Sequence, residues 1–308
     1  MRNLVEWVTA HPLRGFIAAG LAAFVALPML PVTAWLPGAI VVLSLLAAGP
    51  GAASVAMLGA GLLLFWGFTP ATGMPIAAGI AVLVLAPAYL AGAALAASRS
   101  LSFTYQAATL GACILLVAIH ALLGDPLEVL APVVAYLAPM LEQTAAALAR
   151  FGIESSPQEL GEATVRVAWA TLAWLILLHA ALASFGGLWA FGALREPGLF
   201  GREFRELRLG HFVAWLAVGT FVLTAVVGLV SDGSWQVADD LRFVLAAAFL
   251  LQALAVVHAL RDAQVIGLLP LILAYLAILV LPVALVGLGL ADTWVRFRER
   301  FMRPRAAN

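Results

Sequence analysis

Residues Pro75–Ala97 read PIAAGIAVLVLAPAYLAGAALAA and contain no charged side chain. An α-helix needs about 20 consecutive apolar residues to cross the hydrocarbon core of a bilayer. This stretch therefore predicts a membrane-spanning helix. Because similar stretches recur along the chain, the sequence predicts an all-α fold, a polytopic transmembrane helical bundle.

Nine apolar segments can be separated, and from them we expect eight to ten spans. The segment that begins at Trp35 is short, and prolines and glycines flank it. The segments are Gly15–Leu30, Trp35–Ala48, Ala52–Phe68, Pro75–Ala97, Thr104–Leu123, Val165–Ala193, Phe212–Val230, Phe243–Leu260 and Ile266–Leu290.

The composition supports the same fold class, since 64% of the residues are apolar and 10% are charged. Soluble domains are roughly half apolar and about a quarter charged. We therefore expect residues 1–308 to form a single integral membrane domain whose main partner is the lipid bilayer. The net charge of zero gives no reason to expect a nucleic-acid partner.

Arginines and carboxylates are divided between two long connections. Residues 194–211 contain four arginines, whereas residues 124–164 contain three carboxylates near their end, Glu154, Glu159 and Glu162. Positively charged connections usually stay in the cytoplasm. We expect 194–211 to be a cytoplasmic loop, 124–164 to be an external loop, and the N-terminus to be cytoplasmic.

The basic C-terminal tail, residues 292–308, conflicts with this count. Nine crossings would place the tail outside, although it carries five arginines, at positions 296, 298, 300, 303 and 305. Two interpretations stay open: either the rule fails here, or the count is wrong by one. The extra crossing would then be Leu127–Phe151.

Leu127–Phe151 has the pattern of an amphipathic helix. Its apolar residues recur at steps of three, four or seven, which places them on one helical face. Either this helix lies in the membrane interface, or it packs over the mouth of the bundle. The stripe comprises Leu127, Leu130, Val134, Leu137, Leu141 and Leu148.

Signatures of enzymes are missing from the sequence. It contains no HExxH, GxxxxGK[ST] or GxSxG motif, and the single cysteine, Cys113, excludes an internal disulfide and a CxxC site. We therefore expect no catalytic residue, no metal and no cofactor, and we interpret the protein as non-enzymatic.

A few polar residues lie within the apolar segments. His179, Gln252 and Tyr275 could line a common ligand-binding pocket, since polar groups at membrane depth usually face the bundle interior. The alternative is structural: His179 could be a satisfied neutral histidine, and Gln252 could hold helices together.

The end of the last segment carries three residues that we interpret as structural. Asp292 and Arg296 are four residues apart, which suits an ion pair within one helix, and Trp294 is a typical interfacial anchor. Gly287 and Ala291, also four apart, would allow a close helix contact.

Three stretches together resemble the YybS-like family of bacterial membrane proteins, whose function is unknown. They are EPGLFGREFRELRL (196–209), FLLQALAVVH (249–258) and GLADTWVRFR (289–298). The sequence departs from the family pattern at Ala253, where the family usually has glycine, and around Gly49, where flanking arginines are absent. The hydrophobic layout is similar along the whole chain, but only its last third carries specific motifs.

The family is similar to the S components of energy-coupling-factor transporters and to MreD. The resemblance implies a multi-pass protein of the bacterial cytoplasmic (inner) membrane that binds or transports a small lipid-like or vitamin-like ligand. The alternative that it implies is a scaffold or assembly protein of the cell envelope, with a membrane protein as partner.

Overall fold

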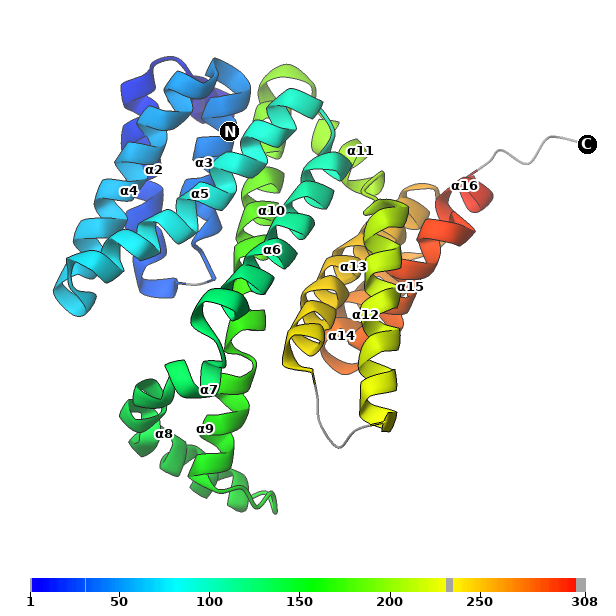
Figure 1. The fold of residues 1–308 in the computed structure, drawn as a ribbon. Helices are drawn as coiled ribbons and strands as arrows, with labels where there is room; N and C mark the ends of the chain where they lie inside the picture. Colours follow the sequence, from blue (N-terminus) through cyan, green and yellow to red (C-terminus); the bar gives the residue numbers. More distant parts are fainter. Residues whose placement is uncertain (1, 31, 231–234, 303–308) are drawn as a thin grey trace, which may run out of the picture. The chain divides into compact units, whose positions relative to one another are not determined.

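The computed structural model describes residues 2–30, 32–230 and 235–302, and every regular element within them is helical (Figure 1). The expected all-α fold is confirmed. The elements are α1 (Arg2–Thr9), α2 (Pro12–Ala26), the 3₁₀-helix η1 (Leu27–Met29), α3 (Trp35–Ala48), α4 (Pro50–Thr72), α5 (Met74–Ser98), α6 (Leu101–Leu123), α7 (Pro126–Val129), α8 (Ala131–Ala149), α9 (Pro157–Arg166), α10 (Ala168–Arg195), α11 (Leu199–Arg205), α12 (Gly210–Val230), α13 (Gln236–Asp262), α14 (Leu268–Val280), α15 (Pro282–Val295) and α16 (Phe297–Met302).

The chain divides into two compact units that are interleaved in the sequence. Unit 1 comprises Met1–Leu110, Leu175–Ala217 and Leu245–Asn308, and unit 2 comprises Gly111–Trp174 and Val218–Val244. Helices α6, α10, α12 and α13 contribute residues to both units. The units are therefore not consecutive domains of the chain.

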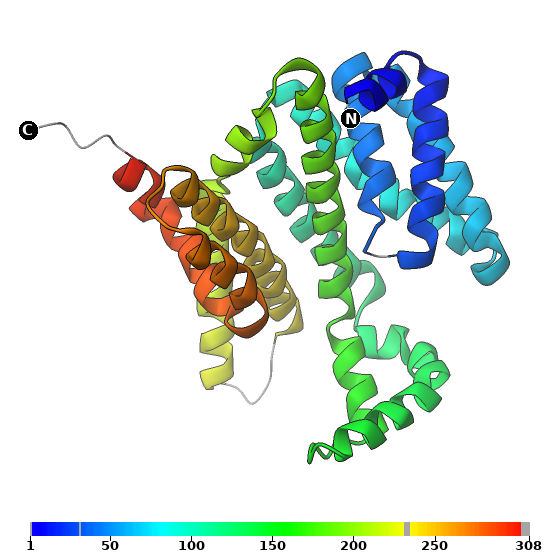
Figure 2. The ribbon, with the colours of Figure 1, turned by 180° about the vertical axis from the view of Figure 1, so that it is seen from behind.

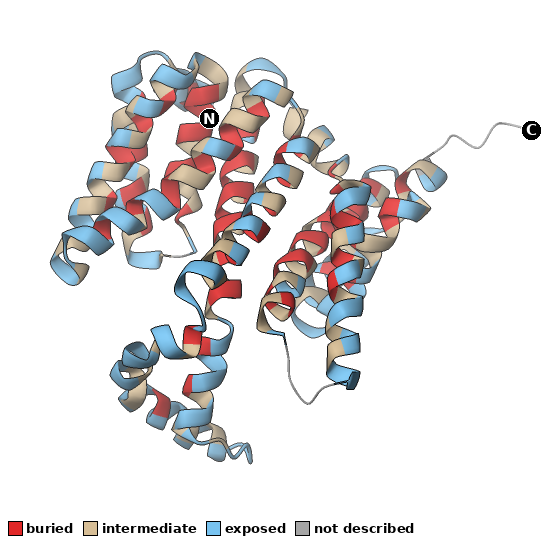
Figure 3. Ribbon diagram, viewed as in Figure 1, coloured by how far each residue is buried: buried red, intermediate tan, exposed pale blue. Residues whose placement is uncertain are grey.

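Seven helices in the described residues are long and apolar enough to cross a membrane: α2 with η1, α4, α5, α6, α10, α12 and α13. Large apolar side chains such as Leu21, Trp66 and Leu229 are exposed on them, and pale blue marks such exposed positions in Figure 3. A soluble protein rarely exposes extensive apolar surface, whereas lipid covers it. The chain is a multi-pass membrane protein.

The number of helices long enough to span a membrane is lower than the nine apolar segments. By length and composition the helices give seven spans, or eight if a bent pair counts as one. The segment Ile266–Leu290, expected as one span, is divided into α14 and α15, which are bent by 117° at Leu281. Pro282 explains the break, because it has no N–H to donate to the carbonyl of Ile278 and its ring obstructs a continuing helix.

Helix α3 is short but returns the chain across unit 1. Helices α2 and α4 run parallel, since Gly15 lies beside Ala56 and Leu27 beside Gly67. Two parallel helices need a return leg between them, and α3 runs antiparallel to α2, with Ser44 next to Gly15. Its 14 residues extend about 20 Å. We therefore interpret α3 as a shortened crossing leg.

The N-terminus and the end of α10 lie at the same end of unit 1. Val5 and Val8 of α1 form an apolar cluster with Leu43, and Phe191 and Leu194 of α10 pack against this cluster. The connection that follows α10 therefore begins beside the N-terminal helix.

In unit 2, the expected amphipathic stretch is helical and its apolar stripe is covered. All six stripe residues are buried or half-buried, while Tyr136 on another face is exposed. Val134 and Leu141 lie against Gly161 of α9. The helix prediction for α8 is confirmed despite Pro139 in its interior. The helix packs against α9 within unit 2, and its place in the membrane interface or over the mouth of the bundle stays a prediction.

A capping box fixes the start of α9. The Ser156 hydroxyl accepts a hydrogen bond from the backbone N–H of Glu159, and the Glu159 carboxylate accepts one from the N–H of Ser156. These bonds with Ser156 lower the pKa of the Glu159 carboxyl from its usual value.

Candidate functional site

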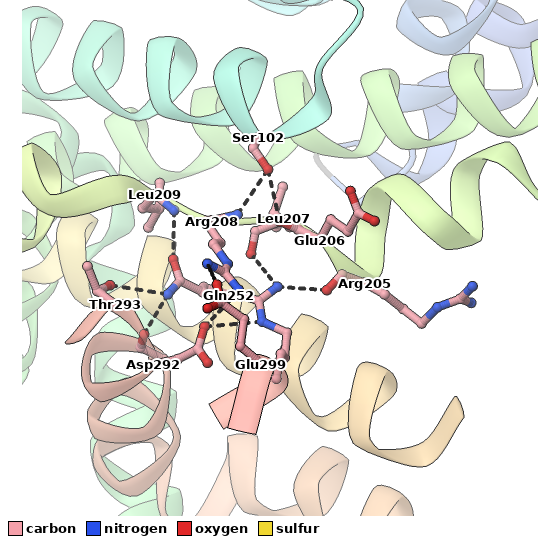
Figure 4. Close-up of polar contacts among 12 residues, drawn as sticks. Ser102, Arg205, Glu206, Leu207, Arg208, Leu209, Gln252, Asp292, Thr293 and Glu299 are labelled. Atoms are coloured by element: carbon pink, nitrogen blue, oxygen red, sulfur yellow. Dashed lines mark hydrogen bonds and ion pairs between the residues drawn. The ribbon is translucent and has the colours of Figure 1, made fainter. Parts of the chain in front are cut away.

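A cluster of buried polar groups lies where α13, α15 and the segment 205–209 of unit 1 meet (Figure 4). We call it the polar root; it comprises Gln252, Asp292, Thr293, Arg298 and the backbone of 205–209. Gln252, Asp292 and Arg298 are between 0% and 4% exposed. Buried polar groups of this kind are costly unless each finds a partner.

Gln252 joins three segments through its side-chain amide. Its Oε1 accepts a hydrogen bond from the N–H of Leu209 at 2.7 Å. Its Nε2 donates to the carbonyl of Gly289 at 2.7 Å and to the Thr293 hydroxyl at 3.4 Å. Because both the oxygen and the nitrogen of its amide are hydrogen-bonded, Gln252 holds α13, α15 and the segment that precedes α12 together.

Gly289 permits the closest approach between α13 and α15. A Cβ atom at this position would lie 2.1 Å from the carbonyl oxygen of Phe249. At Gly287, the residue expected to make a close contact, a Cβ atom would have nothing within 4 Å. The glycine that matters for packing is therefore Gly289.

The Asp292–Arg298 ion pair is the charged part of the polar root. Arg298 Nε donates to Asp292 Oδ2 at 3.2 Å, and Nη2 donates to the same oxygen. Arg298 Nη1 donates to the carbonyls of Arg205 at 2.7 Å and Leu207 at 3.0 Å. Burial lowers the pKa of the Arg298 guanidinium, and the Asp292 carboxylate opposes this effect. An arginine remains charged at neutral pH in either case.

The expected ion pair between Asp292 and Arg296 is wrong. Helix α15 ends at Val295, and Arg296 adopts a left-handed backbone conformation with φ of 53°. Because the helix does not continue through Arg296, this side chain does not reach Asp292, and its Nη1 lies 3.6 Å from Glu299 Oε2 instead. Trp294 packs edge-on against Trp215 at 5.3 Å between ring centroids, and its role as an interfacial anchor stays a prediction.

The segment 205–209 is also held from the start of α6. The Ser102 hydroxyl donates to the Glu206 carbonyl and accepts from the N–H of Arg208, each at 3.1 Å. Gln106 donates to the Arg208 carbonyl at 2.9 Å. The Arg208 side chain donates to Glu299 at 2.8 Å, which adds a second link to the C-terminal segment.

Both ends of the α14–α15 pair lie at this same segment. Arg205 forms an ion pair with Asp262, the last residue of α13, at 3.2 Å. The residues after α15 reach the segment through Arg298. The pair is therefore a hairpin that returns to the face where it began, and Figures 1 and 2 show its two legs folded beside α13. The C-terminal helix α16 and the 194–211 connection lie on the same face.

The residues around the break at Leu281, which form the tip of the hairpin, are apolar and exposed. Leu279 and Val283 are 83% and 79% exposed. The legs have 13 and 14 residues, so each extends about 20 Å, which is shorter than a hydrocarbon core of about 30 Å. Neither leg is therefore long enough to cross the hydrocarbon core by itself.

The three residues expected to share a pocket have different surroundings. Gln252 belongs to the polar root. The Tyr275 hydroxyl lies 2.9 Å from His258 Nε2, and Tyr275 is half exposed. His179 is buried within α10. Gln252 thus agrees with the structural alternative, and Tyr275 has a separate partner.

Sequence reasoning missed Gly289 and Arg298. The sequence indicates Arg298 only as one of the tail arginines, because no spacing rule joins a residue inside a helix to one beyond its end. In the Asp292–Arg298 pair, Asp292 Oδ1 is buried and has no hydrogen-bond partner.

Comparisons with known proteins do not assign the chain to a family. No family model, no curated protein and no solved structure matches it. Within the described residues, no group of three or more His, Cys, Asp or Glu side chains is placed to hold a metal ion.

Proposed function

We propose that this membrane protein is non-enzymatic and binds, and carries across the membrane, a small lipid-like or vitamin-like ligand at the break of the α14–α15 hairpin. The observation that carries the proposal is the helix break at Leu281 between two short legs. We infer from the length of the legs that this break lies at membrane depth. The resemblance to the YybS-like family implies the same class of ligand.

The break offers polar groups in an apolar setting. Pro282 leaves the carbonyl of Ile278 without its usual helical donor. Irregular backbone at membrane depth is tolerated where it is buried in protein or lines a cavity, and transporters use such breaks to hold substrates. A ligand with an apolar body and one hydrogen-bond donor would match the exposed leucine and valine side chains and this carbonyl.

The hairpin is anchored at its root and open at its tip, which suits a moving element. The root is held by Gln252, Gly289 and the Asp292–Arg298 pair. The tip around Leu281 makes no comparable polar contacts among the residues that the structure describes. Movement of the tip would change access to the break while the root stays in place.

Native mass spectrometry of the gently purified protein tests the proposal. The wild type should retain a small molecule of reproducible mass. Pro282→Ala supplies an N–H for the Ile278 carbonyl and should lose that molecule. Pro270→Ala is the matched control, because Pro270 lies in the first turn of α14, where a missing N–H costs little. No retained molecule, or equal retention by both variants, would refute the proposal.

The alternative function is a membrane scaffold, and one observation favours it. The arginines of unit 1 that the structure describes lie at or near helix ends, and several of them are exposed. A photo-crosslinking residue at Gly201 should capture a membrane protein if the scaffold function is right, whereas the same probe at Leu279 should not. Capture at neither position would favour the ligand-binding function.

A further inference from the structure

A second buried polar pair lies in unit 2 and takes no part in the polar root. His120 Nε2 and Asp240 Oδ2 are 2.8 Å apart, and their side chains are 8% and 6% exposed. The pair joins α6 to α13. Histidine is the side chain whose charge changes most readily near neutral pH.

The pair lies about one helical turn from the helix ends. His120 is in the last turn of α6, and Asp240 follows the start of α13 by four residues, or about 6 Å. The α10 residues of unit 2 cover this region. Trp169 donates to the Gly124 carbonyl at 3.1 Å, and the Trp174 ring packs edge-on against Phe243.

The helix ends favour opposite charges on the two groups. A negative charge is favoured near a helix N-terminus and a positive charge near a C-terminus. Asp240 and His120 occupy these two positions. The neighbouring Asp239 is paired with Arg242 at 3.2 Å.

Because the His120–Asp240 pair is buried, the net charge left in this apolar region depends on how many protons the two side chains hold. With Asp240 ionised, Nε2 of His120 donates to Oδ2, and Nδ1 is the nitrogen that gains or loses a proton. A neutral imidazole leaves one buried negative charge, whereas an imidazolium gives an uncharged pair. A proton taken from water thus neutralises the site, and its release to water restores the charge.

Holding two helices together does not require such a pair. Well-packed apolar side chains stabilise a buried contact as well as an ion pair does, or better. Ionisable groups within membrane-spanning helices commonly mark paths of protons or substrates. We propose that His120 and Asp240 form a proton-exchange site that takes up and releases one proton. This site is independent of the proposed ligand site.

Nitrogen NMR of histidine-labelled protein in lipid nanodiscs, titrated from about pH 5 to about pH 9, tests the proposal. His120→Gln assigns the signal. The wild-type signal should change in a single step. In Asp240→Asn the midpoint of this step should shift by about one pH unit or more, which corresponds to a tenfold change in proton affinity. Asp239→Asn is the matched control and should displace it by much less.

Two results would overturn the proposal. A His120 signal that stays constant over the whole pH range would identify a fixed structural ion pair. Equal displacement in Asp239→Asn and Asp240→Asn would show that the adjacent charge, not the contact, controls the histidine. If Asp240→Asn does not fold, Asp240→Glu keeps a carboxylate and should retain the step, and its absence would count against the site.

Discussion

Substituting alanine at Gly289 should separate α13 from α15. The added Cβ atom would lie 2.1 Å from the carbonyl oxygen of Phe249 and 3.1 Å from the backbone nitrogen of Ala253. Both obstacles are backbone atoms, which cannot rotate away as a flexible side chain can. Gly287→Ala is the matched control on the same helix, because its Cβ atom would meet nothing within 4 Å.

The expected loss of stability follows from three contributions. Overpacking in a well-packed region costs about 1–3 kcal/mol. Separation of the helices would also break the bond from Gln252 to the Gly289 carbonyl and leave a buried amide unsatisfied, which costs about 1–3 kcal/mol more. Alanine in place of glycine regains about 1 kcal/mol of helix propensity at either position. The two variants should therefore differ by about 2–6 kcal/mol.

Reversible unfolding in mixed detergent micelles measures this difference, with tryptophan fluorescence as the signal. Two of the nine tryptophans, Trp215 and Trp294, are in contact between α12 and α15, so part of the signal reports on this region. Gly287→Ala should be as stable as the wild type or slightly more stable. If the two variants unfold within about 0.5 kcal/mol of each other, the close backbone contact at Gly289 does not exist in the membrane protein.

Two further predictions concern the polar root and the topology. Arg298→Gln should cost about 3–5 kcal/mol of stability in the same unfolding assay, because it leaves the buried Asp292 carboxylate without its partner. Arg300→Gln changes an exposed arginine and should cost little. Equal losses of stability in the two variants would contradict the buried pair. In a cysteine-free background, single cysteines at Gly201 and Arg300 should react with a membrane-impermeant reagent from the same side of the membrane. A cysteine at Ser155 should react from the opposite side. Labelling of Gly201 and Arg300 from opposite sides would refute the returning hairpin.

The sequence was sufficient to find the helices. Each of the nine apolar segments is mostly helical, although two of them contain a break, and the stripe on Leu127–Phe151 correctly identified the packed face of α8. Hydropathy and periodicity report which residues avoid water, and these properties are local. They were reliable wherever one segment formed one helix.

The polar root could not be predicted because it depends on where α15 ends. The i,i+4 rule suggested Arg296 as the partner of Asp292, since the rule assumes a continuing helix. Arg296 instead takes a left-handed conformation that ends the helix, and the chain then brings Arg298 back to Asp292. The cost of an amide in lipid suggests a structural role for Gln252, but its partners Leu209 and Gly289 lie 43 and 37 residues away along the chain.

Hydropathy and the distribution of arginines disagree about the side of the membrane on which the C-terminal tail lies. Hydropathy counts apolar segments and says nothing of direction, so it treated the last segment as a ninth crossing. The distribution of arginines reports direction, and it placed residues 194–211 and the C-terminal tail on one side. Because Arg298 bonds to the carbonyls of Arg205 and Leu207, the returning hairpin satisfies both signals without an extra span. When an apolar count and the arginine distribution conflict, a proline-broken segment such as the one at Pro282 is therefore the first place to look for a chain reversal.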